Sequence, residues 1–154
     1  METDRHVLID TCVWIDSLRY DKCNTLVKSV LGDSTICIND LIKFELEIGL
    51  SNNSHQEKWE DIKNKLFNLP ISSDIVKILE SYKNDLAKIR KKGKVVTPSG
   101  VDAVIAAQAI KYKKSNFYVL TSNHKDFPTE LFERFETFWI DIDKPFTLCL
   151  YKAK

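Results

Sequence analysis

The feature that most constrains the fold is an alternation of short apolar runs with stretches that have helical periodicity. Residues 6–9, 34–38 and 116–121 form the apolar runs, whose length is typical of buried strands. Helical patterns separate them, so neighbouring strands must run parallel. Right-handed crossovers then place helices on both faces of the sheet. We therefore expect an α/β protein with three α/β/α layers and a mostly parallel sheet of four to five strands.

The remaining segments complete this expected chain order. Asn39 is a typical helix cap, and Ser99 precedes a helix rich in small residues that can pack closely on a sheet. Residues 137–141 give a fourth strand, and residues 146–151 a further edge strand. We expect Trp14 and Trp139 in the core, and Trp59, in a polar helix, to face a partner. The other expected helices cover residues 11–20, 24–32, 55–67 and 72–92.

Length and composition indicate one domain whose net charge is close to zero. The chain has 154 residues, of which 44% are hydrophobic and 29% charged, and its net charge is +1. We expect a single domain over residues 1–154, with a core at about 6–141 and a C-terminal tail at 142–154. A polyanionic partner would need local basic patches. The four cysteines lack CxxC spacing, which argues against zinc. With no signal peptide and no membrane-length apolar run, we expect a reducing, cytoplasmic setting.

Four acidic residues follow or adjoin the predicted strand ends. Asp10 ends the first strand, Glu45 lies about two turns into the helix after the second, Asp102 begins the helix before the third, and Asp126 follows the third. Functional sites of parallel sheets lie at the carboxyl ends of the strands. Each acid also has a plainer explanation: Asp10 as a helix cap, Asp102 as part of a capping box with Ser99, Glu45 as a surface residue of an amphipathic helix, and Asp126 as a plain loop residue.

The chemistry of clustered carboxylates favours a metal site. Two like charges about 4 Å apart repel by roughly 4 kcal/mol at an effective dielectric near 20. A fold tolerates such a cluster when a divalent cation neutralises it or when one acid stays protonated. Mg²⁺ and Mn²⁺ prefer oxygen ligands, orient phosphodiesters and lower the pKa of bound water.

These motifs together resemble the PIN-domain family. Asp10-Thr11, Glu45-Leu46 with Gly49, Pro98 followed by Asp102-Ala-Val-Ile-Ala-Ala, and Val119-Leu120-Thr121 before Asn123 and Asp126-Phe127 occur in the family's order. Length and order are similar to the single-domain VapC-like toxins of toxin–antitoxin pairs. The resemblance implies a metal-dependent endoribonuclease that is often a homodimer and is held inactive by an antitoxin covering its site. Asn123 departs from the pattern, because the family often has an acid there, and the segment between Gly49 and Pro98 is long.

Within that resemblance the residues take expected roles. Asp10 and Asp102 are expected to bind Mg²⁺ or Mn²⁺, with Asp126 as a third ligand or as part of a second metal site. Glu45 would hold a water molecule or help deprotonate the attacking one. Asn123 either leaves that third role to Asp126 or binds through its amide oxygen. The residues expected to support or orient these acids are Thr11, Thr121, Ser122 and Asn123.

A basic run precedes the loop that leads to Asp102. Such a run is usually a solvated helix end, yet it stands where RNA phosphates would approach the acids. The residues expected to contact RNA are Arg90, Lys91, Lys92, Lys94 and Lys125.

Two other functions remain open from the sequence. One is a housekeeping RNA-processing nuclease, and the other is a PIN-like interaction module with weak or no catalysis, which Asn123 would suit. A dinucleotide-binding domain is excluded because no GxGxxG follows the first strand.

Overall fold

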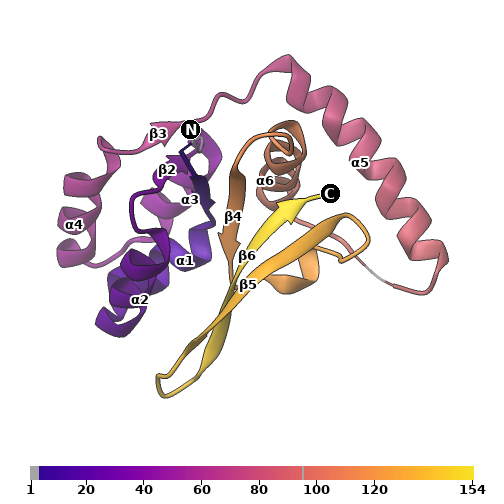
Figure 1. Ribbon diagram of the computed structural model, residues 1–154. Helices are drawn as coiled ribbons and strands as arrows, with labels where there is room; N and C mark the ends of the chain where they lie inside the picture. Colours follow the sequence, from indigo (N-terminus) through magenta and orange to yellow (C-terminus); the bar gives the residue numbers. More distant parts are fainter. Residues whose placement is uncertain (1–3, 95) are drawn as a thin grey trace.

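The computed structural model describes residues 4–94 and 96–154, which form a six-stranded mixed sheet in the order β3-β2-β1-β4-β6-β5 (Figure 1). β1 (His6–Ile9) lies between β2 (Thr35–Ile38) and β4 (Phe117–Thr121), and β3 (Phe67–Asn68) is the short edge beside β2. These four strands are parallel. β6 (Phe146–Ala153) and β5 (Phe132–Ile140) add an antiparallel hairpin.

Helices connect the parallel strands. α1 (Thr11–Arg19) and α2 (Asp21–Leu31) join β1 to β2, whereas α5 (Ser73–Lys91) and α6 (Gly100–Lys111) join β3 to β4. These two connections run in opposite directions across the sheet, so right-handed crossovers place them on opposite faces. α3 (Asp40–Gly49) and α4 (Asn53–Lys63) lie between β2 and β3, and a 3-10 turn, η1 (His124–Asp126), follows β4. None of the described helices is long and apolar enough to cross a membrane.

The α/β class and the three layers are confirmed, but the C-terminal part differs from expectation. The sheet has six strands rather than four to five, because β3 and both hairpin strands join it. The strand expected at residues 137–141 is longer and begins at Phe132. The tail strand is interior, since β6 pairs with both β4 and β5, and β5 forms the edge. Apolar residues alone could not show which of two hairpin strands reaches β4.

Two of the three tryptophans differ from expectation in whether they are buried. Trp14 is buried as predicted, but Trp59 is also in the core, only 1% exposed, and packs edge-to-face on Trp14 with ring centroids 5.4 Å apart. Trp139, expected in the core, is 63% exposed on the edge strand β5. A helix that is polar on most sides still buries one large residue, and an edge strand can leave a large residue without cover.

Candidate active site

Three of the four acids singled out in the sequence line one open hollow at the carboxyl ends of the parallel strands, and the fourth, Asp126, does not. The hollow has a volume of about 470 Å³. It receives side chains from the start of α1, from α3, from the start of α6 and from the segment after β4. The lining residues are Asp10, Thr11, Cys12, Ile15, Glu45, Ser99, Asp102, Ser122 and Asn123.

Asp10 is both the cap of α1 and the buried centre of the hollow. It is 4% exposed. Its Oδ1 accepts a hydrogen bond of 2.7 Å from the backbone N–H of Thr11, and its Oδ2 accepts one of 2.7 Å from the hydroxyl of Thr121. The Cys12 thiol is 3.5 Å from the same Oδ2. Burial raises the pKa of Asp10, the bond from Thr121 opposes this, and the charge of Asp102 adds to the rise.

Glu45 reaches the hollow from the exposed side of α3. Asn39 begins this helix, since its side chain accepts a hydrogen bond of 2.8 Å from the N–H of Ile42. Two turns later, Glu45 Oε1 accepts a hydrogen bond of 3.3 Å from the hydroxyl of Thr11. Desolvation raises the pKa of Glu45, and the charges of Asp10 and Asp102 raise it further, although the bond from Thr11 opposes the rise.

Asp102 is fixed by the predicted capping box. The Ser99 hydroxyl donates to Asp102 Oδ2 at 2.7 Å and accepts a bond of 3.3 Å from the Asp102 backbone N–H. The acid therefore stands in the first turn of α6, facing the same hollow as Asp10. Asp102 is therefore part of the cap of α6 and also lines the hollow, just as Asp10 caps α1 and lines the hollow.

Asp126 lies behind the hollow rather than in its lining, and it is only 3% exposed. Asn123 donates its side-chain amide to Asp126 Oδ2. The hydroxyl of Tyr82 donates to the Asp126 backbone carbonyl at 3.4 Å. Burial, together with a side-chain hydrogen bond to Asp102 and the charge of Asp102, raises the pKa of Asp126 to about 6. The Asn123 amide is thus engaged with Asp126.

The hollow therefore concentrates negative charge, and its lining residues include no lysine, arginine or histidine. Asp10, Glu45 and Asp126 all have raised pKa values, and Asp102 contributes to each of these rises. Across residues 4–94 and 96–154, however, no three His, Cys, Asp or Glu side chains are grouped so that they could hold one ion together. The acids influence one another without forming a closed coordination cage.

Two further residues beside these acids, Cys12 and Tyr82, were not among the expected site residues. Cys12 lines the hollow, and its thiol accepts a hydrogen bond of 3.1 Å from the Ser122 hydroxyl; burial raises the pKa of the thiol to about 11. Its position in the first turn after Asp10 was the available signal. Tyr82, on α5, had no such signal, because its contact with Asp126 depends on tertiary packing.

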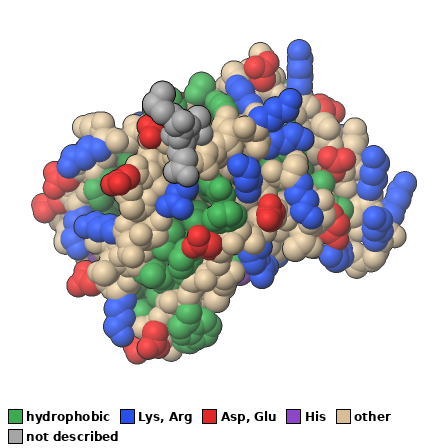
Figure 2. Space-filling model, in the orientation of Figure 1, with side chains coloured by type: hydrophobic (Ala, Val, Ile, Leu, Met, Phe, Trp, Pro, Cys, Tyr) green, Lys and Arg blue, Asp and Glu red, His purple; other side chains and the backbone are tan. Residues whose placement is uncertain are grey.

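The five basic residues expected to contact RNA differ in whether their side chains are engaged within the fold. Arg90 donates from Nε and Nη2 to the Val96 carbonyl, at 3.2 and 3.0 Å, and Lys94 pairs with Glu130. Lys91, Lys92 and Lys125 are exposed. Figure 2 shows lysine and arginine side chains gathered over α5.

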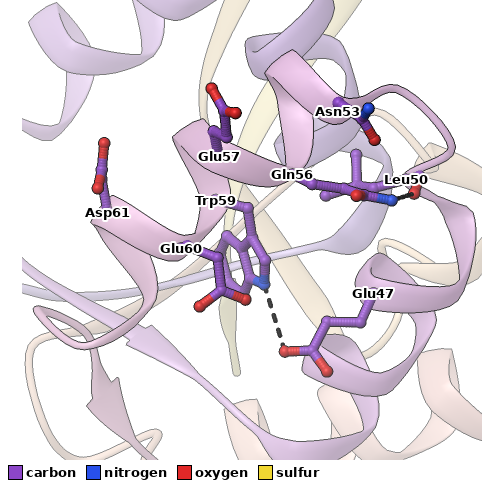
Figure 3. Close-up of a pocket in the computed structure, with 8 residues that line it drawn as sticks. All are labelled: Glu47, Leu50, Asn53, Gln56, Glu57, Trp59, Glu60 and Asp61. Atoms are coloured by element: carbon purple, nitrogen blue, oxygen red, sulfur yellow. Dashed lines mark hydrogen bonds between the residues drawn. The ribbon is translucent and has the colours of Figure 1, made fainter.

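A second hollow lies between α3 and α4, away from the first, and has a volume of about 550 Å³ (Figure 3). Glu47 and Trp59 meet in it, since the indole Nε1 donates to Glu47 Oε1 at 3.4 Å. Lys63 forms ion pairs with Glu60 at 2.8 Å and with Glu47 at 3.8 Å, and these pairs offset part of the negative charge of this second hollow. The two hollows share no lining residue.

Comparison with known proteins points to one family. The profile of the PIN domain matches residues 7–128, which include all four acids. A chain from the crystal structure of VapBC2 from Rickettsia felis, bound to a DNA fragment from their promoter, has a similar fold with a TM-score of 0.54 at 16% sequence identity. The match covers 74% of this chain and 98% of that one. No curated protein sequence matches significantly.

Proposed function

The chain belongs to the PIN-domain family, whose members are typically metal-dependent nucleases, and from this premise we propose that it hydrolyses RNA phosphodiester bonds. The observation that carries the proposal is the shared hollow of Asp10, Glu45 and Asp102, with Asp126 behind it. Residues from four separate segments meet there without a basic side chain among the lining residues. Such an arrangement is costly for folding and is expected where charge serves a function.

The donor set fits Mg²⁺ or Mn²⁺. Both prefer oxygen ligands, and Mg²⁺ commonly binds through one or two carboxylates while keeping several waters. The spacing of the acids, which influence one another but do not close a cage, suits that mode. Asp10 and Asp102 would hold the ion, and Asp126 would act through Asp102, with which it shares a side-chain hydrogen bond. A bound ion would lower the pKa of a water molecule and offset charge on the phosphate.

The protein's own residues would orient the acids of the site and deprotonate the attacking water. Thr121 and the Thr11 N–H fix both oxygens of Asp10, so this carboxylate keeps one orientation. Glu45 is exposed at the mouth of the hollow, held by Thr11, and its raised pKa suits a group that accepts a proton from the attacking water. Asn123 orients Asp126 through its amide.

We further propose that the nuclease is a toxin restrained by an antitoxin. A solved structure with a similar fold is that of a VapBC2 complex, which supports a protein partner of this kind. Phe44 and Ile48, 62% and 68% exposed, flank Glu45 on α3 and give an antitoxin segment an apolar surface beside the hollow. A homodimer through helices away from the acids completes the proposal, and sedimentation at micromolar concentration tests it.

Cleavage of RNA with and without added Mg²⁺ or Mn²⁺ tests the activity. Cutting should require the metal, and Asp10→Asn or Asp102→Asn should abolish it while the far-ultraviolet spectrum stays unchanged. Asp61→Asn is the matched control, because Asp61 is an exposed acid of the second hollow. Cleavage that survives both site substitutions would refute the proposal, and a chain that never cuts would be an interaction module instead.

Growth of a bacterial host tests the toxin role separately. Expression should arrest growth, and Asp10→Asn should relieve the arrest. An active nuclease that leaves growth unaffected would point to housekeeping RNA processing.

A further inference from the structure

The hairpin of β5 and β6 extends beyond the carboxyl ends of the parallel strands, where the carboxylate hollow lies (Figure 1). Thr121 at the end of β4 pairs with Cys149 of β6, which pairs with Thr137 of β5. Trp139 follows two residues further along. Strand spacing and rise put the Cα atoms of Thr121 and Trp139 roughly 12 Å apart. Thr121 contacts Asp10, so a short stretch of nucleic acid is long enough to reach from Asp10 to the exposed Trp139.

Trp139 lies on the face of the hairpin that also carries the turn after β4. Thr137 contacts Cys149, and side chains two residues apart on a strand share a face, so Trp139 shares that face and pairs with Thr147. His124 contacts the Thr147 hydroxyl at 2.7 Å and the Tyr151 hydroxyl at 2.9 Å. The hydrogen bonds of this histidine thus connect the face that carries Trp139 to η1, which begins directly after Asn123 of the hollow.

Charge is sorted between the two faces of β5. Arg134 shares the face of Trp139, with its guanidinium 5.8 Å from the Tyr151 ring centroid. Glu133 and Glu136 pair with Lys152 and Leu150, on the opposite face. Lys125 is exposed on η1, two residues after Asn123 of the hollow and next to His124, which contacts the hairpin. The face nearest the acids therefore offers positive charge and an uncovered indole.

We propose that Trp139 stacks on a base of single-stranded RNA whose backbone passes from the carboxylate hollow over η1, where Lys125 contacts a phosphate. This inference rests on the proposed ribonuclease function and adds a position that holds the substrate. An exposed indole can stack on any base, and stacking of this kind supplies about 1–3 kcal/mol per base in single-strand binding. Burying an uncovered side chain of this size would give the strand affinity without base-specific hydrogen bonds.

Intrinsic fluorescence reads this contact directly. Trp14 and Trp59 are buried, 6% and 1% exposed, so a quencher in solution reaches Trp139 first. Titration of the full chain with oligoadenylate in EDTA, where cutting does not occur, should quench part of the emission. Trp139→Phe should remove that quenching, and Trp139→Ala should weaken binding roughly tenfold, measured by fluorescence anisotropy of labelled RNA. Trp139→Phe should retain more affinity than Trp139→Ala, because its ring still stacks.

Phe135→Ala is the control, since this residue is 49% exposed on the other face, beside Tyr118. It should leave affinity unchanged. If the wild-type chain binds and cuts RNA but Trp139→Ala binds equally well, the inference is wrong and the proposed function stands. A wild-type chain that neither binds nor cuts RNA overturns both. If Trp139→Ala instead changes the sedimentation coefficient while RNA affinity is unchanged, Trp139 contacts protein and the inference is overturned.

Discussion

Thr121 donates a 2.7 Å hydrogen bond to Asp10 across 111 positions of sequence, and both residues are buried. The same hydroxyl accepts a bond of 2.9 Å from the N–H of Asn123. One side chain thus orients the central acid and starts the turn that leads to Asp126. The parallel pairing of β1 with β4 brings the two residues to neighbouring strand ends.

Thr121→Val should impair metal binding as well as stability. Valine keeps the shape but leaves a buried carboxylate oxygen and the Asn123 N–H without this partner, which costs about 1–3 kcal/mol. Loss of a partner that orients a ligand typically lowers metal affinity 10- to 100-fold. Mn²⁺ titration by calorimetry, beside a urea melt, measures both. Thr137→Val, whose hydroxyl contacts Cys149, is the control; equal Mn²⁺ affinity in all three proteins would limit Thr121 to a structural role.

Mn²⁺ should stabilise the folded chain. An ion at 100 times its Kd that binds only the native state adds about 2.7 kcal/mol. Asp10→Asn should reduce this gain and Asp61→Asn should preserve it, as followed by thermal melting with a titration of MnCl₂. An equal gain in the wild type and Asp10→Asn would place the ion elsewhere.

Without metal, the protein should lose stability as the pH rises from 5 to 7.5. The folded pKa of Asp126 is about 6, above the ordinary 3.8, so its neutral form is favoured on folding. The stability this provides is complete below pH 3.8 and is lost as the pH passes 6. The lowered pKa of His124 works in the opposite direction. Comparison with Asp126→Asn in EDTA isolates the acid, because the variant should show a smaller fall in melting temperature over this range.

Trp59 and Trp139 should differ sharply when replaced by alanine. Trp59→Ala removes a buried ring that packs on Trp14, and we expect a cost of about 3–5 kcal/mol. Trp139→Ala removes an exposed ring and should change the free energy of unfolding by no more than about 0.5 kcal/mol. Urea unfolding of both variants checks this, and a large loss in Trp139→Ala would mean that β5 needs its indole to fold.

The exposed lysines at the end of α5 should contribute to RNA affinity through phosphate contacts. The double substitution Lys91→Glu, Lys92→Glu should weaken binding and reduce the slope of log K against log salt by about 0.7 for each lost contact. Lys28→Glu, an exposed change on α2, is the control. A salt slope equal to that of the wild type would remove these lysines from the binding surface.

Local patterns identified much of the fold and the acids themselves. The apolar runs gave β1, β2 and β4, and the caps at Asn39 and Ser99 act as predicted, because strand burial and helix capping depend on nearby residues. The hairpin could not be placed in this way. The position of β6 between β4 and β5 depends on long-range pairing that leaves no periodic signature in the sequence.

The sequence by itself therefore determined the α/β class, the order of the elements and which acids follow strand ends, since these depend on side-chain period and chemistry. Only the tertiary structure decided that Asp126 is buried next to Asp102 with a raised pKa, that Trp59 is buried and that Trp139 is exposed. Burial and electrostatic coupling are properties of groups brought together in space, and residues distant in the chain supply most of those neighbours.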